Sequence, residues 1–319
     1  RDQGEAVEFA SRDYAEHGAT GFVASVMTAP WDSMLHVAEA LSEAAHALAE
    51  HTEVGARCLG IQYEGPFLNA KFRRVHRSEW LLPASVARAK QMIEAARGAC
   101  VIVTMAPEVD GADEAARFLH DQGIVCSVGH TAAKYREGLL AIGLGFRSIT
   151  HAFNAMPPLD HREPSILAAF IQEERTTIQL ICDGFHVAPV MVDLLYRAIG
   201  DRLVLATDYT APAGAGYRIE GGVVRAGDGT IAGSALHIDQ AVRNLMTYTG
   251  IPFETAIIGA TAAPARLLGL GHEIGTIAKG RRADLSIWDA DYEVISTIVR
   301  GTPVHGATRL DGTREPQVT

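Results

Sequence analysis

The sequence predicts an α/β fold, a (β/α)8 TIM-type barrel that lacks its first strand, followed by strands of a small β-sandwich. Three observations lead to this prediction. Short β-rich runs alternate with helical stretches over residues 21–208, ionisable residues follow several of these runs, and alternating polar and apolar residues begin near residue 282. Strand–helix alternation with continuously apolar strands is typical of a parallel sheet.

Seven runs are short, apolar and rich in β-branched residues, as expected of buried strands. They occupy residues 21–26, 59–63, 101–105, 124–128, 147–150, 178–182 and 203–207. The stretches between them carry apolar residues at helical spacing, as in residues 34–51, 84–98 and 113–123.

The count of strands leads to a further expectation, because eight parallel strands close a TIM barrel. We expect the chain to be part of a longer native chain whose preceding segment carries the first strand. The strand at 21–26 and the strand at 203–207 should then each pair on one side only, with free edges that face one another.

The chain divides into two predicted domains. Residues 1–281 form the barrel domain, and residues 282–319 form C-terminal antiparallel strands of a small sandwich domain, ending in a tail. The last residues, "DGTREPQVT", have the composition of a disordered tail.

Composition limits the partners of the protein. The net charge is −10, and no basic stripe is present to displace counterions, so we expect no nucleic-acid partner. The apolar runs are too short to span a bilayer and no signal-peptide pattern opens the sequence, which favours a cytoplasmic protein without membrane contact. A small anionic ligand would need local positive groups.

Ionisable residues recur where the predicted strands end. Glu64 follows the second strand, His130 the fourth, His151 the fifth and Asp208 the seventh. The carboxyl ends of barrel strands form the face on which such folds build active sites. Alternative interpretations are a turn cap for Glu64 and capping or core positions for single histidines, but their recurrence on successive strands favours a functional site.

This set of residues has a defined chemistry. Glu64, His130 and His151 supply one oxygen and two nitrogens, which suits Zn²⁺ or another divalent ion of the first transition row. Three protein ligands leave one position for water, whose pKa the metal would lower. Asp208 could take a proton from the water and deliver it to a leaving amine, so the pattern indicates metal-assisted amide hydrolysis.

Several motifs, in this order along nearly the whole chain, resemble those of the N-acetylglucosamine-6-phosphate deacetylases of the amidohydrolase superfamily. They are "YEGPFLN", "VGHTAA", "THAFNAMPPLDHREP", "CDGFHV", "TDYTAPAG", "GTIAGSAL" and "IGTIAKGRRADL". The resemblance implies a metal-dependent barrel with a small β-sandwich domain that works as a homodimer. It also implies that a small amino sugar phosphate is the substrate, with acetate released from N-acetylglucosamine 6-phosphate.

The resemblance also assigns roles to individual residues. It implies that Glu64, His130 and His151 bind the metal and that Asp208 and His76 are catalytic. The implied substrate-binding residues are Val75, His76, Asn154, Ala155, Arg162, His186, Ile231, Ala232 and Gly233. Arg162 is independently suited to phosphate because its guanidinium fork matches phosphate oxygens, and the family often takes one phosphate contact from the partner subunit.

At three positions, a purely structural role remains as an alternative to a functional one. His76 lies in the basic stretch "KFRRVHRSEW" and could be a solvated surface histidine. Asn154 could form an Asx turn before "MPP". Asp183 could simply cap the helix that follows it.

The chain departs from the family pattern in two places. Arg74 stands where the family has glycine, in "FRRVH", and the His-x-His pair of the first strand is absent. We expect zinc as the cofactor, with Fe²⁺, Co²⁺ or Mn²⁺ as alternatives. Alternative functions are deacetylation of another N-acetylated amino sugar phosphate, such as N-acetylgalactosamine 6-phosphate, or a binding role for an inactive, truncated barrel.

Overall fold

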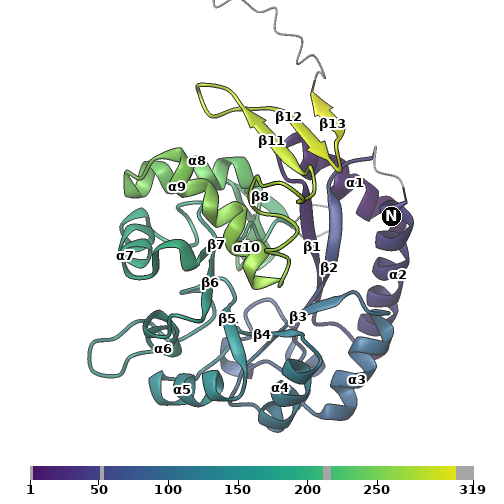
Figure 1. The fold of residues 1–319 in the computed structure, drawn as a ribbon. Helices are drawn as coiled ribbons and strands as arrows, with labels where there is room; N and C mark the ends of the chain where they lie inside the picture. The colour runs from purple at the N-terminus through teal and green to yellow at the C-terminus, as the bar shows by residue number, and fades with distance from the viewer. Residues whose placement is uncertain (1–2, 51–53, 211–216, 307–319) are drawn as a thin grey trace, which may run out of the picture.

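A curled, seven-stranded parallel sheet forms the centre of the molecule (Figure 1). The structure is a computed structural model that describes residues 3–50, 54–210 and 217–306. The strands lie in chain order and are β1 (Gly21–Met27), β2 (Arg57–Glu64), β3 (Cys100–Met105), β4 (Val125–Val128), β5 (Phe146–Ile149), β6 (Thr177–Leu180) and β7 (Leu203–Leu205). All seven predicted strands are therefore confirmed.

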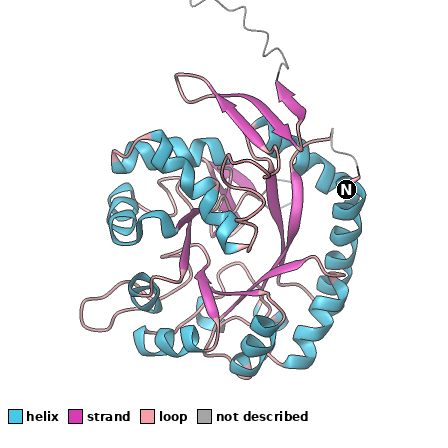
Figure 2. Ribbon diagram, viewed as in Figure 1, coloured by secondary structure: helices cyan, strands magenta, loops and turns pink. Residues whose placement is uncertain are grey.

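Most helices lie on the outer, convex side of this sheet, as the colouring by secondary structure shows (Figure 2). The described residues form ten α-helices. They are α1 (Gln3–Glu16), α2 (Trp31–Ala49), α3 (Val86–Ala95), α4 (Ala112–Asp121), α5 (Tyr135–Gly143), α6 (Ile166–Gln172), α7 (Pro189–Ile199), α8 (Ile238–Thr249), α9 (Phe253–Ala256) and α10 (Ala262–Leu267). In the view of Figure 2, α10 lies across the gap between β7 and β1. In the described part of the chain, four 3₁₀ turns occupy Ala70–Phe72, Ser78–Trp80, Gly200–Arg202 and Ile257–Ala260. None of the described helices is long and apolar enough to cross a membrane.

The sheet curls through most of a barrel without closing. Among the described residues, β1 pairs only with β2, and β7 pairs only with β6. The expectation of two free strand edges is confirmed. A cavity of about 600 Å³, lined by residues of both edges, lies between the inner faces of β1 and β7.

Two small antiparallel sheets complete the fold. The C-terminal sheet, predicted from the alternating pattern, consists of β11 (Leu285–Trp288), β12 (Val294–Val299) and β13 (Thr302–Gly306). The second sheet, β8 (Arg218–Glu220), β9 (Val223–Arg225) and β10 (Ile231–Ser234), was not predicted, because its strands have only three or four residues. The predicted tail, residues 311–319, lies outside the described residues, and the domain boundary at 281/282 stays a prediction.

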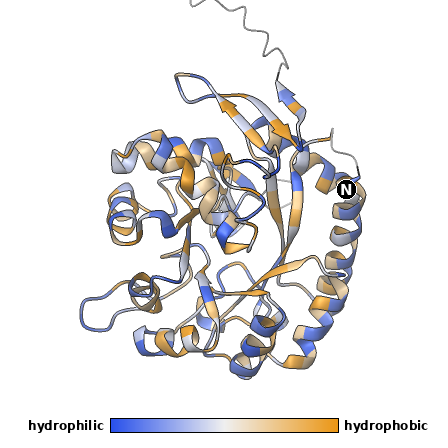
Figure 3. Ribbon diagram, viewed as in Figure 1, coloured by the Kyte–Doolittle hydropathy of each residue, from blue (hydrophilic) through white to orange (hydrophobic). Residues whose placement is uncertain are grey.

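Apolar side chains fill the space between sheet and helices. The helices carry both hydrophilic and hydrophobic residues (Figure 3), and α5 and α7 expose large apolar side chains such as Leu140 and Val190. The inner face of the curl is more polar. Thr150 Oγ1 lies 2.9 Å from Thr104 Oγ1 and 2.6 Å from Ser127 Oγ, so three strands are linked by buried hydroxyl groups. This face carries the side chains of the candidate site at its carboxyl end.

Candidate active site

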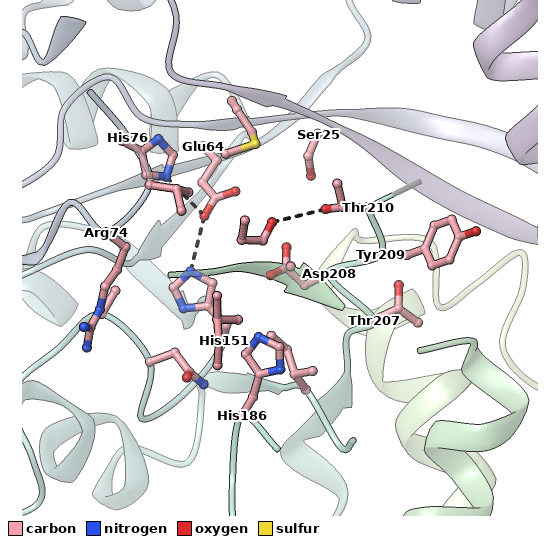
Figure 4. Close-up of a pocket in the computed structure, with 18 of the residues that line it drawn as sticks. Ser25, Glu64, Arg74, His76, His151, His186, Thr207, Asp208, Tyr209 and Thr210 are labelled. Atoms are coloured by element: carbon pink, nitrogen blue, oxygen red, sulfur yellow. Dashed lines mark hydrogen bonds and ion pairs between the residues drawn. The ribbon is translucent and has the colours of Figure 1, made fainter. Parts of the chain in front are cut away.

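The predicted ligands Glu64, His130 and His151 converge where β2, β4 and β5 end. Figure 4 shows Glu64 and His151 facing one another. Glu64 Oε1 lies 2.9 Å from His130 Nε2 and 3.3 Å from His151 Nε2, and the two nitrogens are 3.1 Å apart. Ligands 2.0–2.1 Å from a tetrahedral zinc ion lie about 3.3 Å from one another. The triangle of donor atoms therefore has the size that one small divalent ion requires.

The backbone and a second contact orient the ligand rings. His130 and His151 have φ angles of 48° and 33°, in the left-handed region that residues other than glycine rarely adopt. His130 Nδ1 donates to the Phe72 carbonyl oxygen over 3.0 Å. Burial lowers the pKa of His130 to about 4, so the ring is neutral at pH 7 with its Nε2 lone pair facing Glu64.

Glu64 is an anion in this setting. Burial by itself raises the pKa of its carboxyl group, but contacts with His130, His151 and His76 outweigh burial and hold the pKa well below the ordinary range. Burial would lower the pKa of His151, yet the hydrogen bond to Glu64 raises it. An anionic oxygen beside two imidazoles is a suitable donor set for zinc.

Asp208 follows β7 and faces the same space, again with a left-handed φ angle, 48°. Asp208 is exposed to the open cavity. Desolvation by the groups around its carboxyl group, followed by the charge of Glu64, raises its pKa to about 6. A carboxyl group that titrates near neutral pH is suited to both accept and donate a proton.

The predicted stretch Ile231–Gly233 lies beside Asp208. Ser234 N donates to the Asp208 carbonyl oxygen (2.9 Å), and Thr210 N donates to the Ser234 carbonyl oxygen (3.0 Å). A Cβ atom on Gly233 would lie 2.3 Å from Thr210 Oγ1, so the close approach of β10 requires glycine there.

His76 is buried, so the alternative of a solvated surface histidine does not describe its position. Its Nε2 lies 3.8 Å from Glu64 Oε1, and its ring meets the His130 ring edge-on at a centroid distance of 4.5 Å. Asn154 also lines the cavity, and its Nδ2 donates to the Ala152 carbonyl oxygen over 3.1 Å.

His186 is held by Asp183, whose role the sequence left open. Asp183 Oδ1 accepts the backbone N–H groups of Phe185 and His186, each over 2.8 Å, and Oδ2 accepts His186 Nδ1–H over 2.6 Å. Asp183 thus caps this turn and also orients the His186 ring, whose other nitrogen remains available to a ligand.

A cavity of about 740 Å³ joins these groups, a volume suited to a sugar-sized ligand. The structure brings every predicted site residue except Arg162 to its wall. The lining residues among them are Glu64, Val75, His76, His130, His151, Asn154, Ala155, His186, Asp208, Ile231, Ala232 and Gly233. Arg162 is exposed on the loop between β5 and α6, where its backbone N–H donates to Asp160 Oδ1 over 2.7 Å.

Glu108 is a residue to which the sequence assigned no role. Its carboxylate accepts Thr131 Oγ1–H and Ala132 N–H, each over 2.6 Å, and Asn69 Nδ2–H over 2.9 Å. It therefore ties the loop after Glu64 to the turn that carries His130. Its position just after the third strand was the signal that could have identified it.

Replacement of Glu108 by alanine is expected to lower the free energy of unfolding by about 2–4 kcal/mol, since hydrogen bonds to a charged group contribute about 1.5–3 kcal/mol each and are not additive. Urea unfolding of the metal-free protein measures this directly. Glu114→Ala on the exposed face of α4 is the matched control. A change within about 0.5 kcal/mol for Glu108→Ala would remove it from the support of the site.

A second group of ionisable side chains lies between α1 and the start of α8. Asp13, His17 and His237 come within reach of one another, and His17 Nδ1 is 3.3 Å from Asp239 Oδ1. The His17 and His237 rings, however, stack with centroids 3.6 Å apart and planes 11° apart. Because imidazole binds a metal in the plane of its ring, two parallel rings cannot both bind one ion as they stand.

The chain is similar to several known proteins. The sequence profile described as the Amidohydrolase family matches residues 174–304. A protein named N-acetylglucosamine-6-phosphate deacetylase from Vibrio furnissii is 31% identical over 93% of this chain and 76% of its own length. A protein named N-acetylgalactosamine-6-phosphate deacetylase from Escherichia coli O157:H7 is 32% identical over 90% of this chain and 78% of its own length.

A solved structure gives a similar result. The N-acetyl-D-glucosamine-6-phosphate deacetylase from Mycobacterium smegmatis, in a mutant form in complex with N-acetyl-D-glucosamine-6-phosphate, superposes with a TM-score of 0.84 at 33% identity. The match covers 93% of this chain and 79% of that chain.

Proposed function

This chain belongs to the N-acetylglucosamine-6-phosphate deacetylase family of amidohydrolases, and we propose that it hydrolyses the amide of N-acetyl-D-glucosamine 6-phosphate. Water breaks the bond between the acetyl carbon and the sugar nitrogen. The products are acetate and D-glucosamine 6-phosphate. The observation that carries the proposal is the triangle of Glu64, His130 and His151 donor atoms, with Asp208 on the wall of the same cavity.

Membership of the amidohydrolases implies a divalent metal, and we propose Glu64, His130 and His151 as its ligands in this chain. Their oxygen and nitrogen donors favour zinc, with Fe²⁺, Co²⁺ and Mn²⁺ as the other metals to test. When bound, such an ion supplies a Lewis acid that polarises a carbonyl group and lowers the pKa of water.

The remaining chemistry falls to side chains of the chain itself. Asp208 accepts a proton as water attacks the amide carbon and returns it to the departing sugar nitrogen. His76, buried beside Glu64, holds and polarises the amide carbonyl oxygen. Asn154, His186 and the β10 backbone bind the sugar and its phosphate, together with Val75 and Ala155.

The position of Arg162 supports a homodimer. Arg162 is exposed and does not line the cavity of its own chain. A phosphate role for this residue therefore requires that it reach the cavity of a second copy. We propose such a dimer, and a cytoplasmic location remains a prediction from the sequence.

Arg162→Ala is expected to raise KM for the 6-phosphate sugar at least about tenfold and to leave the unphosphorylated sugar unaffected, because it removes a guanidinium contact to phosphate. Mixing Arg162→Ala with Asp208→Asn tests the subunit exchange. In a mixed dimer, one cavity holds the wild-type Asp208 and receives the wild-type arginine from the other chain. Acetate release well above that of either variant alone supports the dimer, whereas no recovery after verified exchange contradicts it.

The galactosamine epimer is the second candidate substrate, because a relative at 32% identity carries that name. Epimers differ in one hydroxyl position, which depends on contacts within the pocket. The deciding experiment measures acetate release from both N-acetylated 6-phosphates by the metal-loaded protein. A higher kcat/KM for the glucosamine form supports the proposal, and a higher value for the galactosamine form replaces it. If neither sugar phosphate releases acetate, the deacetylase function is rejected.

A further inference from the structure

Arg74 lines the active-site cavity from the turn that ends at His76. The turn is closed by His76 N, which donates to the Arg73 carbonyl oxygen over 3.0 Å. Arg73 Nη1 in turn donates to the His76 carbonyl oxygen over 2.7 Å. Arg73 therefore stabilises the backbone of the turn, and the neighbouring Arg74 side chain is left to extend along the cavity wall (Figure 4).

The backbone at Arg74 is in the left-handed region, with a φ angle of 52°, whereas Val75 is not among the residues with positive φ. When only the first of the two central residues of a turn has a positive φ angle, the turn has the type II′ pattern. Glycine is favoured at that first central position. An arginine here is unfavourable for the backbone. Such local strain occurs preferentially at functional sites, where it holds a side chain in place.

Among the residues that the structure describes, the charge at this position has no partner. Two arginines line the cavity, Arg74 and Arg225. Arg225 Nη1 donates to the Gly229 carbonyl oxygen (3.0 Å), and its Nε lies 3.7 Å from a Glu220 oxygen. Within residues 3–50, 54–210 and 217–306, the guanidinium of Arg74 makes no hydrogen bond or ion pair.

The position of this free cation also suits an extended ligand. In Figure 4, Arg74 and Asp208 flank His151 from opposite sides. A substrate whose amide lies between Asp208 and Glu64 would direct its other end toward the side of Arg74. An anionic group on that side would lie beside the Arg74 guanidinium and away from the Asp208 carboxylate.

We propose that Arg74 is a specificity-determining residue that binds the substrate phosphate within its own subunit. The inference rests on the proposed function, since it assigns the phosphate end of that substrate. A guanidinium can donate two parallel N–H bonds to phosphate oxygens, a geometry that lysine does not reproduce. Arg74 thereby selects phosphorylated over unphosphorylated sugars without contacting the reacting amide.

The test compares Arg74→Gly, Arg74→Ala and Arg74→Lys with the wild-type enzyme on N-acetylglucosamine 6-phosphate and on N-acetylglucosamine. Arg74→Gly suits the left-handed turn, so its melting temperature should equal or exceed that of the wild type and exclude misfolding. We expect KM for the phosphorylated sugar to rise at least about tenfold with kcat within about threefold, partial rescue by lysine, and no change for the unphosphorylated sugar. Arg77→Ala is the matched control, since Arg77 is exposed and stacks on Trp80 away from the cavity.

A parallel binding measurement separates this inference from the proposed function. Calorimetric titration with glucose 6-phosphate and with glucose reports the phosphate contact without any acetyl group. If the wild type releases no acetate, the proposed function fails, yet weaker glucose 6-phosphate binding by Arg74→Gly still supports an anion contact. Equal phosphate-dependent binding, or an unchanged KM, for Arg74→Gly and the wild type overturns the role of Arg74.

Discussion

Replacement of His130 by alanine is expected to remove the bound metal and the deacetylase activity together. His130 Nε2 lies 2.9 Å from Glu64 Oε1 and 3.1 Å from His151 Nε2, so its loss leaves two donors where three converge. Loss of a residue that merely supports a metal ligand costs about 10- to 100-fold in affinity or activity, so loss of a ligand should cost more than about 100-fold. Metal content after dialysis and acetate release are the two measurements.

Two further variants make this result interpretable. His130→Asn retains a residue type that tolerates the left-handed φ angle of 48°, so it separates the loss of the imidazole from backbone strain. His120→Ala removes an exposed histidine on α4 and should leave metal content and activity unchanged. Full metal occupancy in both His130 variants would show that the ion is held elsewhere.

Asp208→Asn is expected to keep the metal and lose turnover by about 10²- to 10⁴-fold or more, the contribution typical of a positioned acid–base group. The amide has nearly the shape of the carboxyl group and tolerates the left-handed backbone, but it cannot accept a proton. Asp193→Asn on α7 is a control that changes a carboxyl group far from the chemistry. A loss of only about twofold with the metal retained would exclude Asp208 from proton transfer.

The pH profile offers a second measure of Asp208. Desolvation, followed by the charge of Glu64, raises its pKa to about 6 in the metal-free protein. A bound cation favours the carboxylate and lowers this value. Because Asp208 must be deprotonated to accept a proton, kcat/KM should fall as the pH decreases, with the midpoint at or below pH 6.

Much of the fold could be predicted because local patterns encode it. The seven strands between residues 21 and 207 are continuous apolar runs separated by helical stretches. This alternation is typical of a parallel sheet with its strands in chain order. The strands β8–β10 were missed because three- and four-residue strands, one of them wholly exposed, have no measurable periodicity. The position of Glu108 just after the third strand could be seen in the sequence. Its structural role could not, because it depends on hydrogen bonds from Asn69, Thr131 and Ala132, which lie far away in sequence.

The sequence by itself determined which residues stand at the ends of strands, and hence that Glu64, His130, His151 and Asp208 share one face. Only the tertiary structure decided which cations reach that face. Arg162 and Arg74 both lie in loops with no periodic pattern, and their side chains are long and exposed. The fold leaves Arg162 outside the cavity and turns Arg74 along its wall, because the path of each loop depends on packing between segments distant in the chain.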